Sequence, residues 1–290
     1  MRSFEDLNPI AVSVYFLLIT VISMFTMDVF LILISFFGAL TYFFSKNGLK
    51  NPKSHLFPLL LFAVTALINP FVSHNGATVL FVLNNNPITL ESAIYGLAMA
   101  FMLTGVLYWF RLFSEIMTSD KLIYVFGALS PKIALLLSLS LRYAPYFAQQ
   151  VRKVKAAQTA LGLYKEDNII DRVKGGMRIF SVMVTWVLEN GIITADSMTA
   201  RGYGIGRRSR FSIFSWKAWD VSLLALSGLL SIASVFLLRN NVFSFYPYFA
   251  LPILNAKSIS GYILYFLLSL LPTIIHAKEA AKWRFLQSKI

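Results

Sequence analysis

The most distinctive run of residues in this sequence is Ala195–Gly204, in which small and polar residues lead to an arginine between alanine and glycine. Ala200 permits close approach of another surface, and Gly202 can end a helix in a left-handed turn. Arg201 would then project a permanently charged fork of five donors from the helix end. Such a group suits an acidic groove on a partner protein. The alternative is a basic residue that complements the helix dipole beside a glycine cap.

A second run, Ala157–Gly162, also ends in small residues and a glycine, but leucine takes the place of the arginine. Gly162 is a natural helix stop. Leu161, unlike Arg201, cannot form a charge-assisted pair.

Other chemistry is poorly supported by the sequence. No G-x-x-x-x-G-K-[ST] phosphate loop is present, and the glycine-rich run Gly202–Gly206 follows a predicted helix rather than a strand. Cysteine is absent, which excludes a disulfide framework and thiolate metal sites. His55, His74 and His276 lie on three separate segments, without a carboxylate at metal-ligand spacing. We therefore expect no metal site and no cofactor.

The two runs lie at the ends of two predicted helices. Pro131 fits the first turn of a helix that runs to about Leu161, with an apolar first half and a basic second half. Asn168 is a predicted N-cap for a second helix that runs to about Arg201. Residues at steps of three or four form one small or apolar stripe along it: Ile169, Val173, Gly176, Phe180, Val184, Val187, Gly191, Thr194 and Met198. This pattern favours an amphipathic helix that lies beside a membrane. The alternative is that Ile179–Ile193 crosses the membrane, as a seventh span in addition to the six described below. That stretch is short and contains Glu189.

The composition is that of a membrane protein. Of the 290 residues, 57% are hydrophobic and 13% are charged, whereas soluble domains carry about 25% charged residues. Six apolar runs predict membrane helices: Ile10–Met27, Asp28–Phe44, Pro58–Val72, Ile88–Phe113, Trp219–Leu238 and Ile259–Ile275. The first two runs are nearly continuous, and a hairpin that places Asp28 at an interface is the better interpretation.

The basic residues predict the orientation. Three lysines follow the second run, none lies in 73–87, sixteen Lys or Arg lie in 111–217, and four lie in the C-terminal tail. With both termini in the cytoplasm, 24 of the 26 basic residues lie on the cytoplasmic side, as the positive-inside rule requires. The net charge of +13 is thus explained by membrane topology, and we expect no nucleic-acid partner.

These residues carry a family resemblance. Ala195–Gly204 resembles the second Ala-Arg-Gly signature of the T component of energy-coupling-factor transporters, the CbiQ-like family. Arg142–Pro145, followed by Ala157–Gly162, resembles the region of the first signature, and Ile88–Ser92 resembles the entry to the family's long fourth span. The resemblance covers about Ile88 to Tyr203. It departs from the family pattern at Leu161, where arginine is usual. The resemblance therefore implies that the first coupling contact is apolar here, or uses Lys153, Lys155 or Lys165, or is weaker.

The resemblance implies an all-α integral membrane protein of about six transmembrane helices with long cytoplasmic amphipathic coupling helices. The expected organisation is a four-helix membrane region over 1–113, a coupling module over 114–217, and two membrane helices with a basic tail over 218–290. The implied ATPase-coupling residues are Ala200, Arg201, Gly202, Ala160, Leu161 and Gly162. The implied supporting residues are Arg142, Pro145, Gln158, Ser197 and Met198.

The role implied by the resemblance is that of a non-catalytic membrane scaffold. Its partners would be two cytoplasmic ABC ATPases, a substrate-binding S component and membrane lipid, and the imported substrate a vitamin, a vitamin precursor or a metal ion. Two alternatives stay open from the residues alone. A membrane-embedded enzyme would use Glu189 and Asp196, which are seven residues apart on one helix face. A stand-alone secondary transporter would need paired internal repeats with broken helices and polar residues at the middle of the membrane, which we do not find in the sequence.

Overall fold

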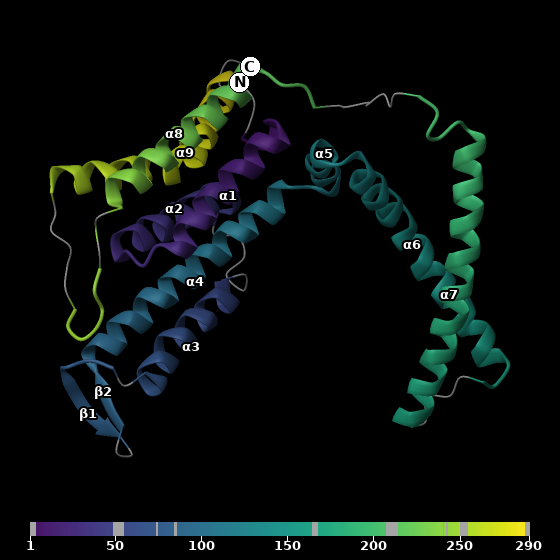
Figure 1. Cartoon of the computed structure of the whole chain (residues 1–290), viewed down its shortest axis with the longest axis horizontal. Coiled ribbons are helices and arrows are strands. Elements are labelled where there is room, and N and C mark those ends of the chain that lie inside the picture. Colours follow the sequence, from purple (N-terminus) through teal and green to yellow (C-terminus); the bar gives the residue numbers. More distant parts are fainter. Residues whose placement is uncertain are drawn as a thin grey trace. The chain divides into compact units, whose positions relative to one another are not determined.

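The protein is described by a computed structural model that covers residues 4–48, 55–73, 75–83, 86–163, 168–206, 214–239, 241, 243–249 and 255–287. Of the residues named in the sequence analysis, His74 and Lys165 lie outside these ranges. So do several of the basic residues counted there: Arg2, Lys50, Lys53, Arg207, Arg208, Arg210 and Lys289. The chain divides into two compact units, Met1–Val125 with Phe214–Ile290, and Phe126–Ile213. Both are helical, which confirms the predicted all-α membrane class (Figure 1).

The first unit, hereafter the membrane unit, contains six apolar helices and a short hairpin. Its helices are α1 (Pro9–Phe25), α2 (Val29–Asn47), α3 (Leu56–Val72), α4 (Leu90–Ile116), α8 (Ala218–Leu238) and α9 (Ala256–Gln287). Strands β1 (Val79–Leu83) and β2 (Asn86–Thr89) pair antiparallel just before α4. The fourth predicted span began too early, at Ile88, because that residue belongs to β2 and the helix starts at Leu90.

Each of the six predicted spans corresponds to one of these helices. α2, α4, α8 and α9 are long and apolar enough to cross a membrane, and α1 and α3 are apolar helices of 17 residues, the lower end of the spanning range of about 17–25 residues. The two N-terminal helices are separate, as predicted. Asp28 caps α2 by accepting from the Phe30 amide at 2.9 Å, and it also accepts from the Tyr262 hydroxyl at 2.6 Å.

The core of the membrane unit is aromatic. Tyr15, Tyr42, Trp109 and Tyr265 are fully buried among the helices. The Trp109 indole donates to Ser35 Oγ at 3.0 Å, and the Tyr15 hydroxyl donates to the Leu268 carbonyl at 3.0 Å. These bonds satisfy the polar ends of two of the four rings in an interior without water, and they connect α4 to α2 and α1 to α9.

Hydrogen bonds around Asn8 and Asp220, hereafter the joint, connect the N-terminal segment to the residues just before and just after the second unit in the sequence. The buried Asp220 carboxylate accepts from the Asn8 backbone amide at 2.7 Å and from the Lys217 backbone amide at 2.8 Å. The Asn8 side chain donates to the Tyr124 hydroxyl at 3.3 Å. Tyr124 belongs to α5 (Ser119–Leu129), a helix that the sequence analysis did not predict. Asp220 lies in the first turn of α8, where the helix dipole favours a carboxylate.

The second unit, hereafter the paired-helix unit, is dominated by two long helices, α6 (Pro131–Ala160) and α7 (Ile169–Ala200). Their bounds agree with the predicted helices, because Pro131 opens α6 and Gly162 and Gly202 follow the two C-termini in left-handed conformations, with φ of 68° and 81°. Asn168 stands at the predicted N-cap position, although its side chain makes no capping hydrogen bond. α6 continues through Pro145.

Candidate functional site

The paired-helix unit is held together by an aromatic contact near the middle of both helices. Trp186 of α7 packs against Tyr146 and Phe147 of α6, with ring centroids 5.1 and 5.6 Å apart. The Tyr143 hydroxyl lies 2.8 Å from the Thr194 hydroxyl. Tyr143 contacts Thr194, whereas Leu163, further along the chain, contacts Arg178, which lies earlier on α7. The two helices therefore run antiparallel, and they cross, as Figure 1 shows.

The face of α7 that packs in this unit differs from the predicted stripe. Gly175, Ile179 and Met183 are the buried positions, and Thr194 and Met198 are half-buried. Most of the predicted stripe, including Phe180 (64% exposed) and Val173 (59% exposed), faces outward. α7 therefore carries apolar residues on two faces, and by length and composition it is also long and apolar enough to cross a membrane.

The two helices end in the same hydrogen-bonded motif. At the end of α6, Gly162 N donates to Thr159 O at 3.0 Å and Leu163 N donates to Gln158 O at 2.9 Å. At the end of α7, Gly202 N donates to Thr199 O and Tyr203 N donates to Met198 O, both at 2.9 Å. Every donor and acceptor of the second motif lies forty residues after its counterpart in the first motif. In both motifs the residue before the glycine, Leu161 or Arg201, lies on an exposed turn. We call Ala160–Gly162 the first tip and Ala200–Gly202 the second tip.

The two tips lie at opposite ends of the helix pair. Arg178 of α7 donates from Nη1 to the Leu163 carbonyl at 2.9 Å, which places this part of α7 beside the first tip. The second tip follows Arg178 by 23 residues along the same helix, a length of about 35 Å at the helical rise. The structure thus does not bring the two sets of predicted coupling residues together into one site.

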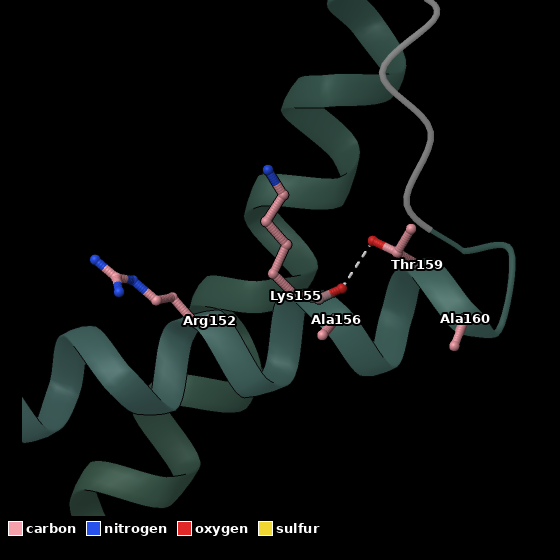
Figure 2. Close-up of a pocket in the computed structure, with 5 residues that line it drawn as sticks. All are labelled: Arg152, Lys155, Ala156, Thr159 and Ala160. Atoms are coloured by element: carbon pink, nitrogen blue, oxygen red, sulfur yellow. Dashed lines mark hydrogen bonds between the residues drawn. The ribbon is translucent and has the colours of Figure 1, made fainter.

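The first tip exposes an apolar residue within basic surroundings. The Leu161 side chain is 72% exposed. Arg152 and Lys155 project from α6 upstream of it, next to a shallow surface hollow that Ala156, Thr159 and Ala160 also line (Figure 2). The Thr159 hydroxyl donates to the Lys155 carbonyl at 2.9 Å, so it is not a free donor (Figure 2). Lys153 is exposed on the same helix.

The second tip exposes a guanidinium group. Arg201 lies at the C-cap position of α7, with its amide donating to the Ser197 carbonyl at 3.2 Å. Its side chain is exposed and forms no ion pair with any carboxylate in the part of the chain that the structure describes. The five donors of the guanidinium are therefore available to a planar acceptor such as a carboxylate.

The predicted supporting residues fall into two groups. Gln158, Ser197 and Met198 shape the tips through their carbonyls, which accept the capping hydrogen bonds. The Gln158 side chain is also buried, and its Oε1 has no hydrogen-bond partner among the described residues. Arg142 and Pro145 are exposed in the middle of α6, about 25 Å of helix from the first tip. They lie on the same stretch of α6 as Tyr143, Tyr146 and Phe147, which contact α7, and a supporting role for them stays a prediction.

The carboxylates that an enzyme would need are not organised as a catalytic site. Glu189 and Asp196 are both exposed on α7. His55 and His276 bond to Tyr108 and Ser45 respectively, in the membrane unit. Across the described ranges, no three His, Asp or Glu side chains gather as metal ligands would.

A multi-pass membrane unit joined to a helix pair with two exposed tips defines a membrane protein that can contact other subunits through helix ends. Comparison with known proteins agrees with that class. The family model described as CbiQ, cobalt transport protein, matches residues 2–213, and the chain belongs to this family of membrane transport proteins.

Relatives in several bacteria are similar to this chain in sequence. The energy-coupling factor transporter transmembrane protein EcfT of Streptococcus equi subsp. equi is 28% identical over 219 residues, which cover 70% of this chain and 77% of that protein. Proteins of the same name from Listeria innocua and Lactobacillus helveticus are 33% and 30% identical over 105 and 118 residues. Those two alignments span 40% and 43% of the relatives' lengths.

Proposed function

We propose that the chain is the transmembrane coupling subunit of an energy-coupling-factor importer, which connects two cytoplasmic ABC ATPases to a substrate-binding S component. The observation that carries this proposal is the pair of identically capped tips at opposite ends of one antiparallel helix pair. Two docking points that are separated by about 35 Å of α7 suit two separate ATPase subunits better than one binding groove. The family match and the EcfT relatives support the same role.

In this proposal, the helix pair transmits motion as one body. The Trp186 contact with Tyr146 and Phe147 and the Tyr143–Thr194 hydrogen bond fix the crossing, so a displacement of either tip turns both helices. ATP-driven closure of the ATPases moves the tips together. The outward apolar face of α7, including Val173 and Phe180, then offers the S component a surface that moves with the tips.

The proposed orientation places both termini and the paired-helix unit in the cytoplasm. The sixteen basic residues of 111–217 support it, while the segment 73–87 has no Lys or Arg. α7 then lies beside the membrane rather than across it. A spanning α7 would bring Glu189 and the basic residues of its first turns towards lipid, which is costly.

The chain has no catalytic role in this proposal. ATP hydrolysis is assigned to the partner ATPases, and substrate choice, whether a vitamin, a vitamin precursor or a metal ion, is assigned to the S component. A secondary transporter or a membrane enzyme would not require ATPase partners, so co-purification distinguishes the three functions.

The test is affinity purification of the tagged chain from its native membranes in mild detergent, with the bound proteins identified by mass spectrometry. We expect two ABC ATPase subunits and at least one small membrane protein in the complex, and ATP hydrolysis only when the ATPases are present. A chain that transports substrate or turns over a reactant after every ATPase has been removed would contradict the proposed function.

A further inference from the structure

We propose that Arg178 of α7 supplies, at the first tip, the cation that Leu161 does not provide, and that it pairs there with a carboxylate of the docked ATPase. This inference rests on the proposed function and names the chemistry of one of its two contacts. The observation behind it is the hydrogen bond from Arg178 Nη1 to the Leu163 carbonyl at 2.9 Å.

The bond holds the guanidinium beside the tip. Leu163 follows Leu161 by two residues, so its backbone lies within about 7 Å of the exposed leucine. Arg178 itself is exposed, next to the buried Ile179 that packs in the helix pair. One guanidinium nitrogen is engaged with the carbonyl, and the remaining donors of the fork are left for an external acceptor.

The lysines of α6 are less suitable for this role. Lys155 and Lys153 precede Leu161 by six and eight residues, which is about 9 and 12 Å along the helix. Side chains on a helix also lean towards its N-terminus, which directs both ammonium groups away from the first tip. An ammonium group also lacks the planar fork that binds a carboxylate in two places.

The two tips then present the same chemistry from different helices. At the second tip, the guanidinium is part of the capped turn itself, at Arg201. At the first tip, the capped turn contributes the apolar Leu161 and the neighbouring helix contributes the guanidinium. The partner surface at the first tip should accordingly combine an apolar pocket with an acidic group at its edge.

The experiment compares Arg178→Ala with Arg172→Ala in the complete complex, and scores retention of the ATPases in membranes after washing. Arg172 is a matched control, because it is an exposed arginine of the same helix with the same charge, and the Leu163 carbonyl is bonded by Arg178 instead. We expect Arg178→Ala to weaken retention at least about tenfold, as expected for truncating one member of an interfacial charge pair. Arg172→Ala should change retention less than about twofold.

Two further variants separate charge pairing from helix capping. Arg178→Gln keeps a donor for the Leu163 carbonyl but removes the charge, so we expect it to be as weak as Arg178→Ala. The double variant Leu161→Arg with Arg178→Ala returns a guanidinium to the tip without restoring the bond to Leu163. We expect it to retain more ATPase than Arg178→Ala but less than the unmodified chain, because the apolar contact of Leu161 is lost. Thermal melting of each purified chain confirms that the fold is intact.

Each result has a definite reading. Full retention by Arg178→Gln, or equal losses in Arg178→Ala and Arg172→Ala, would overturn the inference, as would failure of Leu161→Arg to rescue. Arg201→Ala is measured in parallel. If it loses the ATPases while Arg178→Ala keeps them, the coupling role stands and only the assignment of Arg178 fails. If the unmodified chain binds no ATPase, the proposed function itself fails.

Discussion

Replacing Arg201 by alanine isolates the interaction energy at the second tip. The side chain makes no ion pair within the described part of the chain, and the helix cap is formed by backbone groups of Ser197, Thr199 and Met198. Alanine fits the backbone at this position, where φ is −84° and ψ is 8°. The stability lost by the isolated chain should therefore not exceed the helix-dipole contribution, about 0.3–1 kcal/mol.

The expected loss at the interface is larger. Truncating one member of a buried, hydrogen-bonded charge pair costs about 2–5 kcal/mol, because the partner carboxylate is left without its cation. This corresponds to a decrease of about 30- to 5,000-fold in affinity for the ATPase. Arg201→Lys should recover only part of the affinity, because an ammonium group does not reproduce the planar fork.

The assay is binding of the purified ATPase subunits to the chain in nanodiscs, measured at about 0.1 M and about 1 M salt. Screening should weaken the unmodified second tip more than the Arg201→Ala variant. Thermal melting of the two chains provides the control for folding. If Arg201→Ala binds both ATPases normally and supports full transport, Arg201 is a helix cap and the reasoning from its exposure is wrong.

Four further outcomes are expected. Leu161→Ala should weaken docking by about 1–2 kcal/mol, since 72% of this side chain is available for burial, and a larger loss than that of Arg201→Ala would reverse our ranking of the tips. Gly202→Ala should lower ATPase retention although Arg201 is kept. Gly202 has a φ of 81°, a conformation that costs a residue with a side chain about 1–2 kcal/mol. The control Gly176→Ala, within α7, should leave retention unchanged. In this cysteine-free chain, a cysteine at Leu80 should react with an impermeant reagent from outside and one at Thr159 should not; the opposite pattern would invert the proposed topology. The purified chain alone should show no ATP hydrolysis in a coupled assay, and turnover that persists through purification would contradict a non-catalytic role.

Much of the paired-helix unit could be predicted from the sequence because its boundaries depend on local chemistry. Pro131 has the fixed φ that suits the first helical turn. Gly162 and Gly202 adopt the left-handed conformation that ends a helix. These signals act within a few residues, so they identify helix ends without any knowledge of the surrounding fold.

Other features depend on contacts between distant residues. The sequence placed the apolar stripe of α7 at Val173 and Phe180, whereas the buried positions are Gly175, Ile179 and Met183. Because both faces of α7 are apolar, periodicity alone cannot decide which one packs in the unit. Arg178 was missed for a related reason: as one of several charges on α7 it has no motif, and only the fold places it at Leu163, fifteen residues earlier.

The joint between Asn8 and Asp220 has a consequence for biosynthesis. Its two partners are 212 residues apart, and ribosomes add about 5–20 residues per second. The first helix therefore enters the membrane about 10–40 s before the carboxylate that fastens its N-terminus has been made. During that interval the whole paired-helix unit is synthesised while α1 still lacks this contact and its bond to Leu268. The contacts of α1 with Asp220 and Leu268 can form only after α8 and α9 have been synthesised and inserted. Premature release of the chain should therefore yield a membrane-bound fragment without a completed core.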